Sequence, residues 1–285
     1  MAWRGGESVK GIGTRDLTVR LVAVLSLLMG SSAFAADDAA KLQEAWASAS
    51  RALPDEAMAG FKQIPASSPQ GRESVYGQAM MLLTVQPVTR GNINLSVQLF
   101  QSVIDKNSSD DLGITAKYFL GRIEQIYRFE PDPARAIAIY EDLFHNHPEH
   151  PVAQQAFVKL VLLKLYDRIP DAERAKDFAT FEVQGAKLQD HDAVRDFHLV
   201  MAQACAKFGF SEEKRLDHLL AADAAGVVKD DSKANLIVSI AEVARKLGRK
   251  DLALQYYRRF LAECPRDYRT YTVQQRIAAT EQPAP

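Results

Sequence analysis

The sequence predicts an all-α fold of about six antiparallel helix pairs, closed at its C-terminal end by a capping helix. Three observations lead to this prediction. Apolar residues recur at spacings of three and four, alternation with a period of two is absent over any useful length, and similar segments return about every 39 residues. Self-similarity at such a period is typical of stacked helix pairs, in which each pair buries its apolar face against its neighbours.

The repeat is clearest in four segments that share a small residue, an aromatic residue four positions later, and an aliphatic or aromatic residue three positions after that. The triplets are Ala57, Phe61 and Ile64; Ser96, Phe100 and Val103; Ala136, Tyr140 and Leu143; and Ala253, Tyr257 and Phe260. Gaps of 39, 40 and 117 residues separate their first members, and 117 is three times 39. Two further repeats are therefore expected near Ala175 and Lys214, where the triplets are degenerate.

A second column of residues supports the count. The position five residues before each triplet is occupied in turn by Ala52, Gly91, Pro131, Pro170, Gly209 and Gly248. Five of the six are Gly or Pro, the residues that most often interrupt a helix, so this column predicts the turn within each helix pair. The helix before the turn is amphipathic, as Ile114–Gln125, Val194–Cys205 and Leu236–Val243 illustrate.

This pattern resembles the tetratricopeptide repeat family, in which a Leu-Gly pair marks the first helix, a small and an aromatic residue mark the second, and Pro ends it. The matching residues are Leu120, Gly121, Ala136, Tyr140 and Pro148 in the third repeat and Ala241, Gly248, Ala253, Tyr257 and Pro265 in the sixth. The family unit has 34 residues, so the links here are expected to be longer. The resemblance implies a right-handed superhelical α-solenoid over residues 36–265, a capping helix over 266–280 and a disordered tail over 281–285. In the capping helix, Tyr268, Tyr271 and Ile277 are expected to face inward.

The resemblance also implies where a partner binds. In the family the first helix of each pair lines the concave face, and a protein or extended peptide lies there. Carried over by position, the predicted partner-binding residues are Tyr118, Arg122, Gln125, Leu199, Gln203, Glu242 and Arg245. Family geometry places Cys205 and Cys264 at opposite edges of the solenoid, too far apart for a disulfide, so two free thiols are expected.

The first 35 residues have the features of a secretory signal. Four basic residues precede an apolar run from Leu21 to Met29, and Ala33 and Ala35 form a small-x-small site, which predicts cleavage after Ala35. The apolar run is shorter than the roughly 20 residues of a membrane-spanning helix, although an uncleaved membrane anchor is an alternative. The expected location is the bacterial periplasm, with secretion as a second possibility.

Composition excludes a basic nucleic-acid-binding surface. Removing the four basic and two acidic residues of segment 1–35 from the 35 and 36 in the whole chain leaves 31 and 34, a net charge of −3. We expect no stable membrane insertion after cleavage, because no other stretch approaches spanning length.

No motif for a catalytic nucleophile, a phosphate loop or a dinucleotide appears, so we expect neither a catalytic site nor a cofactor. The cluster His145, His147 and His150 is the most suggestive of metal, but it occupies a repeat-ending turn and is interpreted as a polar turn. His191 and His198 share a helix face, with His198 expected to be partly buried, and His218 stands alone. The acidic pairs Asp110-Asp111 and Asp230-Asp231 are interpreted as helix caps.

These observations predict a non-enzymatic scaffold that binds another protein in the bacterial envelope. A structural subunit that associates with itself is the alternative. An enzyme or metal-binding protein that uses the His145–His150 turn is the third hypothesis.

Overall fold

The computed structural model describes residues 33–166, 170–226 and 230–282, and the described part is helical with no β-strand. The predicted signal peptide lies outside the described residues except for 33–35, and the predicted tail lies outside them from residue 283. Glu281, predicted to begin the disordered tail, is instead the last residue of the C-terminal helix. The elements are α2 (Ala33–Ser50), α3 (Pro54–Lys62), α4 (Gly71–Leu82), α5 (Arg90–Lys106), α6 (Asp111–Arg122), the π-helical turn η1 (Ile123–Tyr127), α7 (Pro133–Asn146), α8 (Pro151–Tyr166), α9 (Asp171–Gly185), α10 (His191–Phe208), α11 (Glu212–Ala225), α12 (Asp230–Lys246), α13 (Lys250–Glu263) and α14 (Thr270–Glu281).

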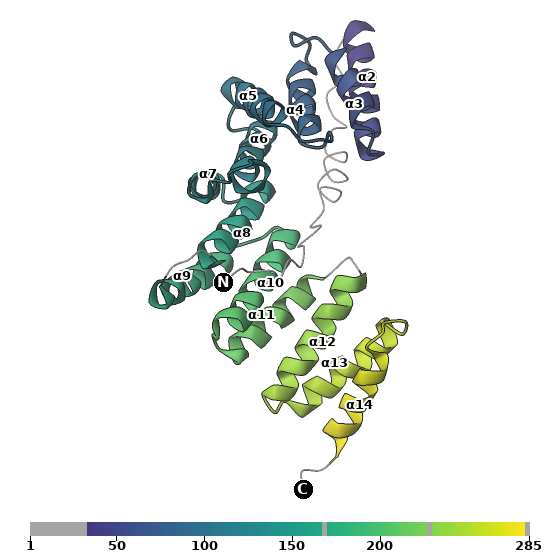
Figure 1. Cartoon of the computed structure of the whole chain (residues 1–285), viewed down its shortest axis with the longest axis vertical. Helices are drawn as coiled ribbons and strands as arrows, with labels where there is room; N and C mark the ends of the chain where they lie inside the picture. Colours follow the sequence, from purple (N-terminus) through teal and green to yellow (C-terminus); the bar gives the residue numbers. More distant parts are fainter. Residues whose placement is uncertain (1–32, 167–169, 227–229, 283–285) are drawn as a thin grey trace. The chain divides into compact units, whose positions relative to one another are not determined.

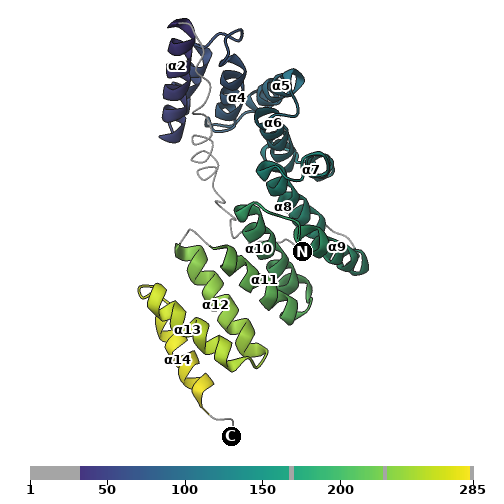
Figure 2. The same cartoon turned by 180° about the vertical axis from the view of Figure 1, so that it is seen from behind.

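The predicted all-α fold of six helix pairs and a C-terminal helix is confirmed. The chain divides into two compact units, Met1–Ala136 and Ile137–Pro285. In the first unit, helices that follow one another in sequence pack together from α2 to α6 (Figure 1). In the second, α8 packs against both α9 and α10, and successive helices pack from α10 to α14 (Figure 2). The unit boundary falls inside α7, the second helix of the third pair.

The four clear triplets form the core of their repeats. Their small residues, Ala57, Ser96, Ala136 and Ala253, are fully buried, and all of the aromatic residues that follow are buried with them. A small side chain at the first position lets the two helices of a pair approach closely, and the aromatic ring one turn later fills the space between pairs. The pattern thus identified the packed positions correctly in these repeats.

The registers of the fourth and fifth repeats differ from the expected positions by one residue. Ala175 and Lys214 are exposed, and the positions three residues into α9 and α11 belong instead to Arg174 and Arg215. Arg174 is buried, with Phe178 and Phe181 following at the expected spacings. In both repeats a long arginine therefore stands where the other repeats have a small residue. Residue types alone placed these two repeats one position away for this reason.

The predicted turn column is confirmed where its residues end a helix. Gly209 and Gly248 have φ angles of 70° and 72°, the left-handed conformation that glycine adopts readily. Ala52, the one residue in the column that is neither Gly nor Pro, adopts the same conformation with φ 61°. Gly91 is the exception, because it lies inside the first turn of α5.

Side-chain caps begin several helices. Asp110 accepts a hydrogen bond of 2.8 Å from the backbone N–H of Gly113 at the start of α6, so its predicted capping role is confirmed. Thr89, Asp190 and Ser211 cap α5, α10 and α11 in the same way. The side chains of Asp230 and Asp231 lie outside the described set.

The predicted orientation of the capping helix was wrong for its tyrosines. Tyr268 and Tyr271 are 89% and 69% exposed, whereas Val273 is buried and Ile277 packs beside it on the last repeat. Val273 and Ile277 are four residues apart and share a helix face, which fixes Tyr271 on another face. The aromatic residues suggested a core role from their type, but the apolar pair of α14 determines which side of the helix faces inward.

Two further features bear on the expected location and redox state. No helix in the described residues is long and apolar enough to cross a membrane. Cys205 is buried and Cys264 is half-buried, and no disulfide joins them in the part of the chain that the structure describes.

Candidate functional site

The predicted partner-binding residues of the first unit do not form an open surface. Tyr118 is only 3% exposed and packs its ring against Phe119, so its expected place on a partner-binding face is wrong. Arg122 and Gln125 are half-buried and bind each other through a 2.8 Å hydrogen bond from the guanidinium to the amide oxygen. This part of α6 and η1 therefore supplies internal contacts more than a free binding face.

In the second unit, Gln203 on α10 is exposed as expected, whereas Leu199 packs against the core of the last repeats. Glu242 and Arg245 bind each other on α12, with the guanidinium donating to the carboxylate at 3.0 Å. The structure thus pairs Glu242 with Arg245 within α12, and of these four residues it leaves Gln203 alone fully on the surface.

Glu242 holds three helices together. Its carboxylate accepts a 2.6 Å hydrogen bond from the Tyr257 hydroxyl on α13 and lies 3.4 Å from the Arg276 guanidinium on α14. Burial acts to raise the pKa of Glu242, but hydrogen bonds from Tyr257 and Arg245 and the charge of Arg276 bring it below its ordinary value. A carboxylate with these partners stabilises the packing of α12, α13 and α14, so its role is structural.

The histidine turn between α7 and α8 forms ordinary turn contacts. His147 donates its backbone N–H to the Leu143 carbonyl, and the His150 ring accepts a 3.1 Å hydrogen bond from the backbone N–H of Val152. Within the described ranges, no group of three or more His, Cys, Asp or Glu side chains is arranged to hold a metal ion.

His218 is not isolated, contrary to expectation. Its Nδ1 atom lies 2.8 Å from Nδ1 of His198, and its Nε2 atom lies 3.7 Å from the Glu182 carboxylate. Burial and the neighbouring His218 lower the pKa of His198 to about 4, and burial lowers the pKa of His218 despite the opposing charge of Glu182. The pair is therefore neutral at pH 7 and forms a polar contact between α10 and α11.

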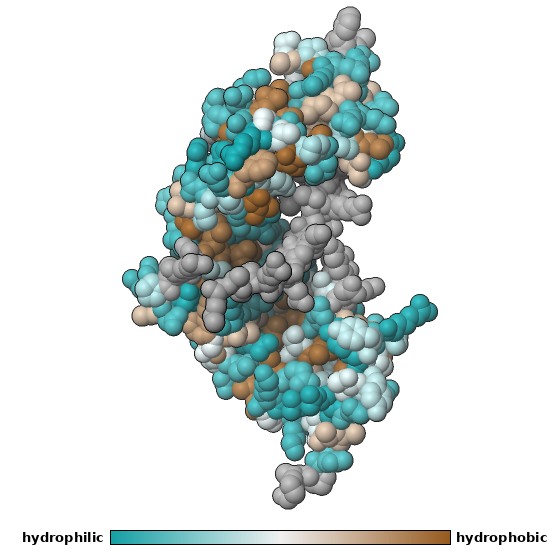
Figure 3. Space-filling model, viewed as in Figure 1, coloured by the Kyte–Doolittle hydropathy of each residue, from teal (hydrophilic) through white to brown (hydrophobic). Residues whose placement is uncertain are grey.

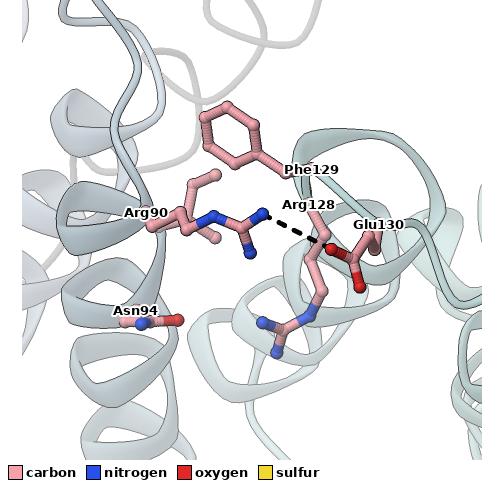
Figure 4. Close-up of a pocket in the computed structure, with 6 residues that line it drawn as sticks. Arg90, Asn94, Arg128, Phe129 and Glu130 are labelled. Atoms are coloured by element: carbon pink, nitrogen blue, oxygen red, sulfur yellow. Dashed lines mark hydrogen bonds and ion pairs between the residues drawn. The ribbon is translucent and has the colours of Figure 1, made fainter.

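A small cleft in the first unit provides the strongest candidate site. It has a volume of about 180 Å³, comparable to one large side chain, and lies between the start of α5 and the loop after η1. Figure 4 shows the side chains of Arg90 and Asn94 on one wall and those of Arg128, Phe129 and Glu130 on the other. The sixth lining residue, Ile93, is buried beneath the polar groups.

The π-helical turn η1 positions the loop wall of this cleft. The backbone N–H of Arg128 binds the Ile123 carbonyl five residues earlier, which closes the wide turn. Glu124, buried within η1, then accepts a 2.8 Å hydrogen bond from the Arg128 guanidinium, and its backbone carbonyl accepts one from the N–H of Asp132. These bonds fix the backbone on both sides of Phe129, which is 56% exposed.

The opposite wall holds an oriented and exposed guanidinium. Arg90 places its charged group 4.9 Å from the centre of the Phe129 ring and 3.4 Å from the Glu130 carboxylate. The Arg90 and Glu130 side chains are 70% and 87% exposed, and an exposed ion pair of this length contributes little stability. The cleft thus offers an aromatic surface and guanidinium N–H donors to an acceptor group from another molecule. Because the Arg90–Glu130 ion pair is exposed and weak, such an acceptor can take the place of Glu130.

The sequence pattern did not indicate this cleft, because it predicted only that the links between helices are longer than those of the family. One signal was available: Phe129 is a large aromatic residue within an otherwise polar, Pro-containing loop, where no core position requires it. Its pairing with Arg90 joins two repeats and depends on their packing.

Comparison with known proteins agrees with the repeat pattern. A family model described as Tetratricopeptide repeat matches residues 238–267, which cover the end of α12, all of α13 and the turn after it. No curated protein matches the sequence.

Solved structures resemble the fold at low sequence identity. PilW, described as a widely conserved type IV pilus biogenesis factor, is 14% identical, with 83% of this chain and 98% of that chain covered and a TM-score of 0.54. A thermophilic TPR protein of Thermus thermophilus is 17% identical, with 73% and 98% covered and a TM-score of 0.42. At 14% identity, the likeness to PilW shows the helical-repeat fold alone.

Proposed function

Taking as the premise that this chain is a tetratricopeptide-like helical repeat protein, we propose that it is an exported, non-catalytic scaffold of the bacterial envelope. It binds a partner protein through an extended segment. The single observation that supports a binding role most directly is the cleft on α5, where the exposed Phe129 ring and the Arg90 guanidinium meet over a space the size of one side chain.

This surface has the composition of a contact site. An exposed aromatic ring held by a rigid backbone loses little conformational entropy on binding, and Arg and aromatic residues contribute most to the affinity of protein interfaces. Leu95 on α5 and Ile126 on η1 are also large apolar residues with substantial exposure in the same unit. A partner segment that places one side chain in the cleft, beside the Phe129 ring and the Arg90 guanidinium, matches these features.

The envelope location rests on the sequence of residues 1–35, with its basic region, apolar run and Ala33-x-Ala35 site. The likeness to PilW, a type IV pilus biogenesis factor, is compatible with such a location. Fractionation of cells and N-terminal sequencing test this part: a periplasmic product that begins at Ala36 is the expected result. A full-length product in the cytoplasm contradicts it.

Site-directed photo-crosslinking tests the binding role. A benzophenone amino acid replaces Phe129, and irradiated cells of the native host are analysed for adducts by mass spectrometry. We expect a discrete adduct with one partner protein, which is lost when Arg90→Glu is added. The matched control replaces Val183, an exposed apolar residue on α9 of the second unit. An identical adduct pattern at both positions, or none at Phe129, contradicts the proposal.

A further inference from the structure

The outward face of α14 carries no free charge. The helix contains two charged residues in the described chain, and both bind other helices of its unit: Arg276 lies 3.4 Å from Glu242, and Glu281 accepts a 2.7 Å bond from Arg258. Figure 3 shows mainly teal and near-white residues at the lower end of the face in view, where α14 lies. The other residues of α14 are uncharged, so they exert no electrostatic repulsion on an identical set.

Four exposed residues form one stripe along this face. Tyr271, Gln274, Gln275 and Ala278 stand at positions i, i+3, i+4 and i+7, so they lie side by side on the helix. They are distinct from the inward pair Val273 and Ile277. The stripe therefore stays free when α14 packs on the last repeat.

The stripe is complementary to itself when two copies run antiparallel. Reversing the helix about the midpoint between Gln274 and Gln275 places Tyr271 of one copy against Ala278 of the other, at both ends. A large ring then faces a small methyl group twice, and the central amides can donate to and accept from each other. Such a pairing is isologous, the form that two-fold symmetric dimers require.

The turn before α14 adds a second exposed aromatic residue, Tyr268. Asp267 accepts hydrogen bonds from the backbone and guanidinium N–H groups of Arg269 at 2.9 and 2.8 Å, and Arg269 also donates to Asn235 at 2.7 Å. The Arg269 guanidinium lies 5.3 Å from the ring of Tyr268, which is almost fully exposed. Ordered, exposed tyrosines are typical of protein interfaces.

We propose that α14 is a self-association surface at which two copies of this chain pair antiparallel through Tyr271, Gln274, Gln275 and Ala278. This goes beyond the proposed scaffold function, since it concerns α14 of the second unit and uses none of the residues that line the cleft on α5. A helix of 12 residues is about 18 Å long, so the interface is small and the dimer is weak and reversible.

Sedimentation velocity over a concentration series tests the proposal, with the protein purified from its expression host and its N-terminus recorded by mass spectrometry. We expect monomers at about 1 μM and dimers at about 200 μM, the range typical of small interfaces. Ala278→Arg and Tyr271→Glu should each weaken dimerisation at least about tenfold. The matched control Ala279→Arg, one residue along and also exposed, should dimerise like the wild type.

Mixing the two weakened variants gives the sharpest result. In an antiparallel heterodimer, the arginine introduced by Ala278→Arg in one copy would face the glutamate introduced by Tyr271→Glu in the other, while the opposite end keeps the native Tyr and Ala pair. We expect the equimolar mixture of the two variant proteins to recover association that neither shows alone. A wild type that stays monomeric at about 200 μM, dimers unaffected by either variant, or a mixture without recovery overturns the proposal. Circular dichroism checks that every variant keeps the wild-type helix content.

Discussion

Nδ1 of His198 lies 2.8 Å from Nδ1 of His218, so one imidazole donates a proton and the other must accept it. The Glu182 carboxylate, 3.7 Å from Nε2 of His218, favours a proton on that nitrogen. His218 then accepts at Nδ1, and His198 donates. Lys214 also binds Glu182, which places one cation, one carboxylate and two neutral rings in a single contact between α9, α10 and α11.

This contact predicts that the second unit loses stability in mild acid. The pKa of His198 is about 4 in the folded protein and 6.5 when unperturbed, so between these values the unfolded chain binds more protons. Stability therefore falls as pH decreases from 6.5 to 4. We expect the His198→Gln variant to lose about 2 kcal/mol less unfolding free energy over this pH range than the wild type, a figure that allows for the partial exposure of the ring. Urea denaturation at pH 7 and pH 4.5 measures the difference, and an NMR titration of His198 with a midpoint near 6.5 would contradict it.

The left-handed conformation of Ala52 predicts a stabilising substitution. The left-handed conformation destabilises an L-residue by about 1–2 kcal/mol. Gly avoids this strain but makes the unfolded chain more flexible, which lowers stability by about 0.4–1 kcal/mol. Ala52→Gly is therefore expected to stabilise the first unit by about 0.5 kcal/mol or slightly more. The reciprocal control is Gly248→Ala, which should destabilise the second unit by a similar amount, because no atom lies within 4 Å of the added methyl group. Thermal denaturation compares the two.

Gly185 predicts a packing penalty at the end of α9. A Cβ atom at this position would lie 2.1 Å from the Phe197 ring, which is buried between α9 and α10. We expect Gly185→Ala to cost about 1–3 kcal/mol, as overpacked cores do. Val183→Ala on the exposed side of the same helix should change stability by less than about 0.5 kcal/mol. Equal effects of the two substitutions in urea denaturation would show that Phe197 does not restrict this position.

The burial of Arg174 predicts that its replacement costs more stability than replacement of the equivalent arginine in the next repeat. Its Nε donates to the Leu165 carbonyl at 3.0 Å, and its guanidinium lies 4.2 Å from the Phe208 ring. Arg174→Ala removes this hydrogen bond and the stacking, at an expected cost of about 2–3 kcal/mol. Arg174→Lys should recover less than half, since an ammonium cannot reproduce the planar contact.

Arg215 is the matched control, because it holds the same position in the next repeat but is half-buried and bonds within its own helix, to Glu212 at 3.2 Å. Arg215→Ala is expected to cost less than about 1 kcal/mol. Chemical denaturation of both variants tests the contrast, and a larger cost at Arg215 would refute it.

Much of the fold was predictable because the repeated positions carry local information. Ala253, Tyr257 and Phe260 are spaced for one face of a helix, and Gly248 marks the turn before them, so residue types alone located the last repeat. In the fourth repeat Arg174 replaces the small residue, and no pattern of residue types indicates that an arginine is buried there. Its burial depends on the Leu165 carbonyl and the Phe208 ring, which neighbouring helices supply.

The candidate site was less predictable, for the same reason. Arg122 and Glu242 were correctly placed on the first helices of their pairs. Their polar groups, however, already form hydrogen bonds within the protein, to Gln125 in one case and to Arg245 and Tyr257 in the other. The sequence by itself determined the helices, their pairing, the repeat period and the turn positions, because these depend on spacing and backbone preference along the chain. Only the tertiary structure decided which polar groups remain available, that Arg90 meets Phe129, and that Tyr271 faces outward, because these depend on distances between segments that are remote in sequence.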